Sequence, residues 1–175
     1  MNPASHQTAL KSSESHRMKK SNKSKIFLPE KIVTGGQTGV DRAALDAAIA
    51  LGIAYGGWCP RGRLAEDGTI PSHYEMEETA SSEYKVRTRQ NVIDSDATLI
   101  IYDQRLRGGT LLTQKIALEL DKPMLCRPVQ GLLEDDVREW LESVRPKVLN
   151  IAGPRESSNP GIYTRSFAFL MAALM

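Results

Sequence analysis

The sequence predicts an α/β protein built on a single doubly wound, mostly parallel sheet of five or slightly more strands, with helices on both faces. Three observations support this fold class. From about Lys31 onward, short β-rich runs alternate with longer helical patterns. The runs are almost wholly apolar, as strands buried on both faces are. Glycine-rich segments follow several of them, which is typical of tight turns from a strand into a helix.

The first strand and helix have clear ends. We expect a strand at 31–34, followed by the glycine-rich segment GGQTG (35–39). An Ala-rich helix comes next and ends at Gly52, a residue type that terminates helices well. A second strand is expected at 53–57. The apolar residues expected on the buried face of the helix are Leu45, Ala48 and Ile49.

A long irregular segment, 58–82, follows the second strand and is rich in prolines and glycines. Loops of this length inside a compact domain are usually functional or disordered. Trp58, Tyr74 and the arginines of this segment argue against disorder. We therefore expect a functional loop between the second strand and the next helix.

The rest of the chain continues the alternation. Strands are expected at 98–102, 123–126 and 148–152. Helices are expected at 83–95, over RGGTLLTQKIALELDK, at 132–144 and at the C-terminus. The last three helices have apolar stripes, formed by Leu112, Ile116 and Leu120, by Leu133, Val137, Trp140, Leu141 and Val144, and by Tyr163, Phe167, Leu170, Met171 and Leu174.

Composition places the chain among soluble globular proteins. It has 175 residues, 41% hydrophobic and 25% charged, which suits one domain of ordinary size. No apolar run reaches the roughly 20 residues that cross a bilayer, so no membrane association is expected. Cys59 and Cys126 are too few for a disulfide scaffold or a Cys-rich zinc site. Without a signal peptide, the expected location is cytoplasmic.

Charge is unevenly distributed along the chain. Residues 1–25 contain six Lys or Arg and one Glu, a net charge of +5, so the remainder carries −3 of the total +2. We expect this polar segment to be a disordered basic tail ahead of a single Rossmann-like ligand-binding domain at 26–175. The tail has no Phe, Trp or Tyr for base stacking, which argues against a nucleic-acid partner.

Four expected strands end in segments that suggest ligand binding: GGQTGVD, GGWCPRGR, RGGTLLT and AGPRESSNPGIY. A parallel sheet brings these ends to one edge, where doubly wound proteins bind ligands. In the first segment, glycines permit close approach, and the following helix start favours a phosphate. The pattern is neither a Walker A loop nor G-x-G-x-x-G, and the alternative is a tight turn without a ligand. The candidate residues are Gly35, Gly36, Gln37, Thr38 and Gly39.

A second glycine turn follows the strand at 98–102. Gly108, Gly109 and Thr110 form it, and Thr113 lies one helical turn further on. Both threonine hydroxyls could therefore face the same cleft. With two glycine turns at one sheet edge, a ligand is favoured over a simple turn.

Arginines supply further candidates at the remaining two exits. Arg61 and Arg63 flank Gly62, and a guanidinium group matches phosphate or carboxylate in a bidentate fashion. The alternative is that the two arginines donate to loop carbonyls. Arg155 and Ser157 precede NPGIY, the start of the last helix, and either contact the ligand or belong to the helix cap.

No catalytic arrangement is apparent. The sequence has no recognisable Ser-His-Asp, Cys-His or paired-carboxylate pattern. Glu66 and Asp67 precede Gly68 and fit a turn, although they could bind a sugar hydroxyl or Mg²⁺. Cys59 and His73 fit packed or loop residues better than a metal ligand or a general base. The sequence therefore predicts a binding protein more readily than an enzyme.

Five segments together resemble the molybdenum carrier-like family: GGQTGVDRAALDAAI, GGWCPRGRLAEDG, YKVRTRQNVIDSDATLII, GGTLLTQ and LNIAGPRESSNPGIY. The resemblance runs from about Lys31 to the C-terminus. It implies a place in the LOG, or lysine decarboxylase-like, superfamily of Rossmann-type nucleotide-ligand-binding proteins. It also implies binding of the molybdenum cofactor, molybdopterin, whose phosphate suits either glycine turn. Assembly as a homo-oligomer, a dimer or tetramer, and molybdoenzymes as cofactor recipients are further implications.

The LOG phosphoribohydrolases differ from this chain in their signature turn. Theirs is Pro-Gly-Gly-x-Gly-Thr, followed by a Glu on the next helix. Here Arg107 replaces the Pro, and Thr113 and Gln114 stand near the position of the Glu. Glu66 or Glu156 could supply a carboxylate instead. The alternatives to a carrier are therefore a nucleotide-processing enzyme of phosphoribohydrolase type and a nucleotide-sensing module.

Overall fold

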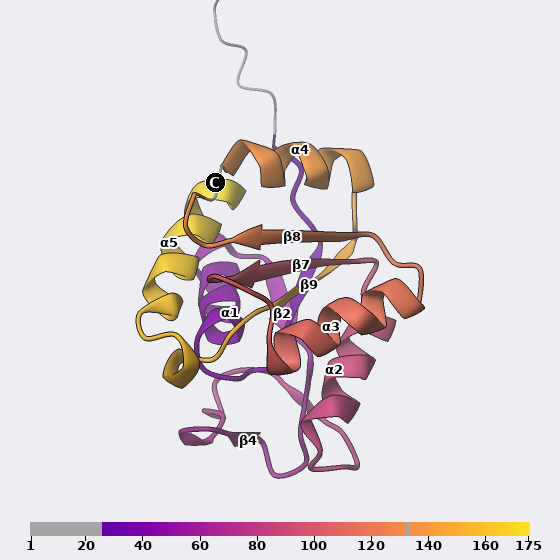
Figure 1. Cartoon of the computed structure of the whole chain (residues 1–175), viewed down its shortest axis with the longest axis vertical. Coiled ribbons are helices and arrows are strands. Elements are labelled where there is room, and N and C mark those ends of the chain that lie inside the picture. Colours follow the sequence, from indigo (N-terminus) through magenta and orange to yellow (C-terminus); the bar gives the residue numbers. More distant parts are fainter. Residues whose placement is uncertain (1–25, 132–133) are drawn as a thin grey trace, which may run out of the picture.

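The structure, a computed structural model, describes residues 26–131 and 134–175 (Figure 1). The expected basic tail and the expected apolar position Leu133 lie outside the described residues. The strands are β1 (Lys31–Val33), β2 (Ala54–Gly56), β3 (Trp58–Cys59), β4 (Leu64–Ala65), β5 (Gly68–Thr69), β6 (Glu77–Glu78), β7 (Ala97–Tyr102), β8 (Met124–Pro128) and β9 (Val148–Ala152). The helices are α1 (Val40–Leu51), α2 (Tyr84–Ile93), α3 (Gly108–Glu119), α4 (Glu134–Val144), the short 3-10 helix η1 (Glu156–Ser158) and α5 (Ile162–Leu174).

Five of these strands form one parallel sheet in the order β2-β1-β9-β7-β8. Ile32 of β1 aligns with Tyr55 of β2 on one side and with Leu149 of β9 on the other. Ile100 of β7 aligns with Ala152 of β9. The last strand of the chain thus lies at the centre of the sheet. This arrangement confirms the predicted α/β fold with a parallel, Rossmann-like sheet.

Helices cover both faces of the sheet (Figure 1). α1, α4 and α5 pack over one face, where Leu99 and Ile101 of β7 enter a large apolar core. α2 and α3 pack against each other on the opposite face, around Val92 and Ile116. The central strands are therefore buried from both sides, which explains their continuous apolar sequences. No helix of the described residues has the length and apolar character that a membrane span requires.

The buried face of α1 differs from the prediction in one position. Leu45 and Ala48 are buried as expected, but Ile49 is 44% exposed. The reason is that α1 and α5 pack closely through small side chains, with Ala44 and Ala47 completely buried. This alanine face turns Ile49 toward the solvent.

The segment 58–82 has more regular structure than predicted. Strands β3 and β6 pair in parallel, and β4 and β5 form a short antiparallel ladder. Each strand is two residues long, too short to produce a recognisable alternation in the sequence. A small second core forms beneath the segment, where Cys59, Ile70 and Tyr74 pack against Leu45 of α1.

Candidate functional site

Three of the predicted strand exits meet in one cleft. The segments after β1, β7 and β9, together with the start of α2, surround a cleft of about 750 Å³. From β1 the chain passes through α1 to β2, at one edge of the sheet. From β7 it passes through α3 to β8, at the opposite edge. The cleft therefore lies where the winding direction changes, the point at which doubly wound proteins bind ligands. The fourth exit follows the edge strand β2, and the described residues of that segment do not line the cleft.

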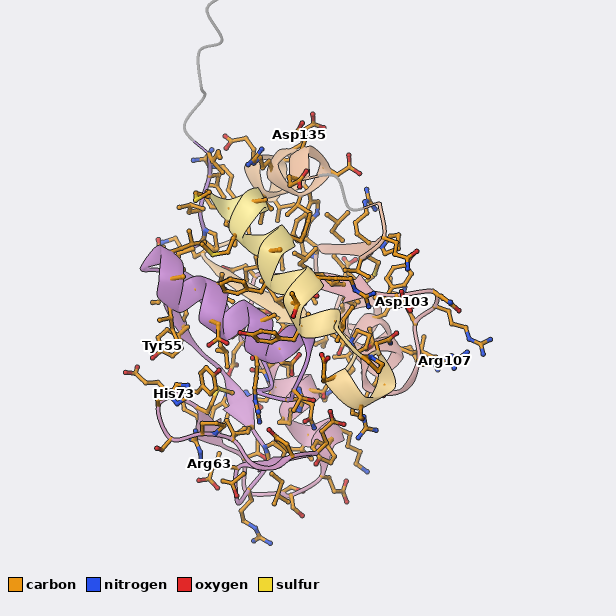
Figure 2. The ribbon with its side chains drawn as sticks, turned by 90° about the vertical axis from the view of Figure 1, so that its left-hand side faces the viewer. Tyr55, Arg63, His73, Asp103, Arg107 and Asp135 are labelled. Carbon is orange, nitrogen blue, oxygen red and sulfur yellow. The ribbon has the colours of Figure 1, made fainter. Side chains whose placement is uncertain are left out.

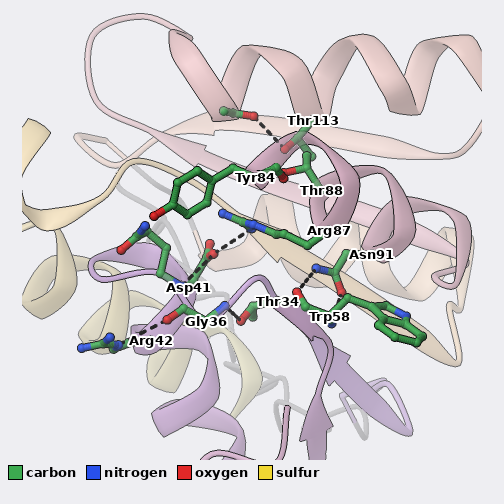
Figure 3. Close-up of polar contacts among 12 residues, drawn as sticks. Thr34, Gly36, Asp41, Arg42, Trp58, Tyr84, Arg87, Thr88, Asn91 and Thr113 are labelled. Carbon is green, nitrogen blue, oxygen red and sulfur yellow. Dashed lines mark hydrogen bonds and ion pairs between the residues drawn. The ribbon is translucent and has the colours of Figure 1, made fainter. Parts of the chain in front are cut away.

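The glycine turn after β1 binds side chains of the protein itself. The N–H of Gly36 donates to Thr34 Oγ1 (3.0 Å), and that of Gln37 donates to Asp41 Oδ2 (3.3 Å). The N–H of Thr38 donates to Gln37 Oε1 (3.0 Å). The anion at this turn is thus the carboxylate of Asp41, where we expected an external phosphate (Figure 3). Of residues 35–39, Gln37 alone lines the cleft, so we leave the glycines of this turn out of the proposed phosphate site.

Arg87 of α2 lies across this turn, and the sequence pattern did not reveal it. Its Nη1 is 3.4 Å from Oδ2 of Asp41, and the two side chains are only 14% and 4% exposed (Figure 3). A Cβ at Gly35 would overlap the Arg87 guanidinium, which explains the glycine. Burial raises the pKa of the Asp41 carboxyl, and the charge of Arg87 opposes that shift. Arg87 also lines the cleft, and its buried Nε has no hydrogen-bond partner among the described residues.

The second glycine turn leaves its donors free. α3 begins at Gly108 with no side-chain cap from Arg107 and no acidic residue in its first turn. The N–H groups of Thr110 and Leu111 donate to Arg107 O, whereas those of Gly108 and Gly109 have no acceptor among the described residues. A Cβ at either glycine would meet nothing within 4 Å. Such an uncapped helix N-terminus attracts an anion.

Arginine side chains make the cleft basic. Thr110 and Thr113, both predicted, line it, and the Thr113 hydroxyl donates to Gly109 O (2.9 Å). Figure 2 shows Arg107 and Asp103 on the same side of the molecule. The predicted Arg155 also lines the cleft, and its Nε is 3.6 Å from a carboxylate oxygen of Glu66. The charged residues that line the cleft are Arg87, Arg105, Arg107 and Arg155, together with Asp41 and Asp103.

A larger hollow of about 1030 Å³ lies beside the cleft, between α1, the long segment after β2 and the start of α5. Its polar groups bind one another. Asp46 accepts hydrogen bonds from the hydroxyls of Tyr74 (2.8 Å) and Tyr163 (2.6 Å). Arg42 forms a bidentate ion pair with Asp67. These groups are already paired, whereas the N–H groups of Gly108 and Gly109 in the smaller cleft have no acceptor among the described residues. The smaller basic cleft is therefore the better candidate for an anionic ligand.

Glu66 and Glu156, the two carboxylates considered for catalysis, make structural contacts. Glu66 accepts hydrogen bonds from the hydroxyls of Thr38 and Ser157 and from the Ser157 N–H (3.0 Å). Although burial acts to raise it, these hydrogen bonds lower the pKa of the Glu66 carboxyl. Glu156 accepts from the N–H of Tyr163 (3.0 Å) at the start of α5. The predicted Ser157, which donates to Glu66, lines the neighbouring hollow. Among the described residues, no group of three or more His, Cys, Asp or Glu could hold a metal ion.

The structure does not bring Arg61, Gly62 and Arg63 to the cleft. Arg61 and Gly62 are exposed in a turn after β3, and Figure 2 shows Arg63 well away from Arg107. The Arg63 guanidinium donates to four loop carbonyls, those of Ile70 (3.2 Å), Pro71 (2.9 Å), Tyr74 (2.9 Å) and Met76 (3.5 Å). Donation to loop carbonyls, the alternative role, is thus the one found for Arg63. We leave all three residues out of the proposed site.

Replacing Arg63 by alanine is expected to lower the free energy of unfolding by about 1.5–3 kcal/mol. The charged hydrogen bonds that tie 63 to 70–74 would be lost, and the carbonyls would need new partners. Arg61→Ala, an exposed neighbour, is the matched control and should cost less than about 0.5 kcal/mol. Urea unfolding compares the two variants. Equal midpoints would show that Arg63 does not hold the segment together.

The fold is Rossmann-like, and its basic cleft lies at the switch point of the sheet, the position where proteins of this class bind ligands. Residues 32–174 match the family described as the circularly permutated YpsA SLOG family. Because the match covers most of the chain, the protein belongs to this family.

A solved structure supports the same relationship. The "Putative molybdenum carrier protein" from Syntrophus aciditrophicus SB is 43% identical to this chain and superimposes with a TM-score of 0.81. The match covers 86% of this chain and 98% of the other. No curated protein matches the chain. The resemblance to molybdenum carrier-like proteins of the LOG type is therefore confirmed.

Proposed function

We propose that the protein is a carrier that binds a small phosphorylated ligand in the cleft between β1, β9 and β7, and that the molybdenum cofactor is the first candidate. One observation carries the proposal: the uncapped N-terminus of α3 opens into the same cleft as four arginines. Free N–H groups and guanidinium groups together are the donors that proteins use for phosphate. The molybdenum carrier-like relative supports the choice of ligand.

The residues of the cleft suit a phosphorylated pterin. Gly108, Gly109 and Arg107 would hold the phosphate, and Arg105 and Arg155 would balance its remaining charge. The flat ring has an apolar surface available, because Tyr84, 44% exposed, and Leu112 also line the cleft. A nucleotide has the same two parts, a phosphate and a flat ring, and is the second candidate ligand.

The contacts of the carboxylates favour a carrier over a phosphoribohydrolase. Glu66 is engaged by Thr38 and Ser157, and Glu156 accepts hydrogen bonds at the start of α5. A general base needs a lone pair directed at the ligand, whereas these two carboxylates accept hydrogen bonds from the protein and do not line the cleft. Transfer of the cofactor to molybdoenzymes and assembly as a homo-oligomer stay predictions from the resemblance. A cytoplasmic location stays a prediction from the sequence.

Accurate-mass spectrometry of the small molecules released from freshly purified, denatured protein tests the proposal directly. A phosphorylated pterin or its oxidation product is the expected result. A nucleotide would keep the phosphate site and change the ligand to the second candidate. Release of neither, combined with no binding of a phosphorylated pterin or a nucleoside monophosphate in solution, would contradict the proposed function.

Replacing Arg107 by alanine is expected to weaken binding of a phosphorylated pterin by about tenfold to a hundredfold, the equivalent of losing one ionic hydrogen bond to phosphate. Arg61→Ala is the matched control, since it removes the same charge from an exposed site outside the cleft. Isothermal titration calorimetry of both variants measures the affinities. A larger loss in Arg61→Ala than in Arg107→Ala would place the phosphate elsewhere.

A further inference from the structure

Asp103 has a buried carboxylate oxygen without a partner. The residue directly follows β7, at the carboxyl edge of the sheet, and lines the basic cleft. Its Oδ1 is inaccessible to solvent and accepts no hydrogen bond from any described residue. Buried polar atoms are nearly always hydrogen-bonded, and an unpaired one is costly. This oxygen therefore calls for a donor that the described part of the chain does not supply.

Asp41, the other aspartate of the cleft, differs from Asp103 because its carboxylate has hydrogen-bond partners. Asp41 accepts hydrogen bonds from Arg87 and from the N–H of Gln37. Asp103, by contrast, has neither a hydrogen bond nor an ion pair with any described residue, although Arg105 and Arg107 are close in sequence and line the same cleft. An acceptor held apart from neighbouring cations in a ligand cleft is placed to receive N–H or O–H donors from the ligand.

We propose that Asp103 recognises the 2-amino-4-oxopyrimidine edge that pterins and guanine share; this inference rests on the proposed function. That edge presents a ring N–H and an amino N–H side by side, and the two oxygens of a carboxylate accept both, as they do from a guanidinium group. The ring would lie against Tyr84 and Leu112, which line the same cleft. The phosphate would lie at Gly108 and Gly109, at the uncapped start of α3.

Specificity follows from the same geometry. A ligand with this edge satisfies the buried oxygen of Asp103, whereas a ligand without the amino group leaves an acceptor unpaired in the cleft. Sites built to bind a polar group discriminate strongly against analogues that lack it, because the unpaired site atom is left without a partner. Asp103 thus acts as a specificity-determining residue, and the phosphate site supplies affinity without selecting the ring.

Calorimetry with guanosine, inosine and xanthosine 5′-monophosphates tests this assignment in the full-length protein and in Asp103→Asn. Wild-type protein should bind guanosine monophosphate at least about tenfold more tightly than inosine monophosphate, which lacks the amino group. An asparagine offers one acceptor and one donor, which match the ring N–H and the 2-oxo group of xanthine. Asp103→Asn should therefore lose guanosine monophosphate affinity and gain affinity for xanthosine monophosphate, a gain that a misfolded variant cannot produce.

A second arm distinguishes a pterin from a guanine ligand. The intrinsic fluorescence of 6-carboxypterin reports its binding, and 6-carboxylumazine, with oxygen in place of the amino group, is its matched control. Tighter binding of 6-carboxypterin than of guanosine, which also lacks a phosphate, points to a pterin, and the reverse order points to guanine. Either order supports the role of Asp103, provided that Asp103→Asn loses affinity for guanosine monophosphate and gains affinity for xanthosine monophosphate.

The measurements separate a failure of the Asp103 assignment from a failure of the proposed function. Equal binding of guanosine and inosine monophosphates, unchanged in Asp103→Asn, would overturn the role of Asp103 and leave the phosphate site intact. An equal loss for all three nucleotides in Asp103→Asn would overturn it too, since that result indicates a contact with the sugar or a structural role. No binding of any nucleotide or pterin would contradict the proposed function and the inference that rests on it.

Discussion

Replacing Arg87 by alanine is expected to lower the free energy of unfolding by about 3–5 kcal/mol, the usual cost of removing one partner of a buried ion pair. Arg87 is the positive partner of Asp41, whose side chain is only 4% exposed. Without the guanidinium, the carboxylate keeps its hydrogen bond from the N–H of Gln37 but loses its counter-charge. The same substitution removes one of the four arginines of the cleft, so binding of a phosphorylated ligand should fall as well.

The destabilisation should depend on pH in a defined direction. Burial raises the pKa of Asp41 in the folded protein, and Arg87 opposes that shift. Loss of Arg87 therefore raises the folded-state pKa further. A group with a raised folded-state pKa loses its contribution to stability as the pH rises through that pKa. The deficit of Arg87→Ala relative to the wild type should accordingly shrink when the pH is lowered from 7 toward 5.

Urea unfolding at pH 7 and at pH 5 measures both effects. Arg89→Ala is the matched control, because Arg89 lies on the same helix and forms an exposed ion pair with Glu119. Pairs of that kind contribute about 1 kcal/mol or less. In an Asp41→Asn background, the cost of Arg87→Ala should also fall, since no charge is left to compensate. A deficit that is the same at both pH values and in both backgrounds would show that the ion pair is not its source.

Replacing Gly39 by alanine is expected to cost about 2–6 kcal/mol, because two penalties combine. The backbone at Gly39 has φ 77° and ψ −128°, a conformation that essentially only glycine adopts. A Cβ there would also overlap Pro154 O and lie 2.8 Å from the backbone N of Glu156. These are backbone atoms of the segment after β9, so a rotamer change cannot relieve the overlap. The two segments would have to separate.

Gly52→Ala provides the control for the conformational part of this cost. Gly52 ends α1 with φ 68°, and a Cβ there would meet nothing within 4 Å. Its replacement should cost only the left-handed backbone penalty, about 1–2 kcal/mol. Thermal and urea unfolding of the two variants gives the difference. If Gly52→Ala were as destabilising as Gly39→Ala, close packing between the segments after β1 and β9 would not contribute.

The segments that follow the strands show how much of the structure can be predicted from local sequence patterns. Apolar runs and glycine turns predicted the strand positions, the parallel sheet and the convergence of strand exits at one edge. They did not predict that β9 lies between β1 and β7, and this order decides which exits share a cleft. The exit after β2 was expected to contribute, but β2 is an edge strand and its segment folds into a separate small core.

The two glycine turns show, at the level of single residues, the same difference between what the sequence predicts and what the tertiary structure decides. Sequence composition by itself determined that both turns allow close approach to the backbone. Tertiary structure decided what approaches: at Gly35 it is the guanidinium of Arg87, and at Gly108 it is open cleft. The physical reason is that a turn conformation depends on neighbouring residues, whereas its occupant comes from a helix far along the chain. Only the packing of α2 against α3 and β3 brings Arg87 to Asp41, and only the strand order opens the start of α3 to a ligand.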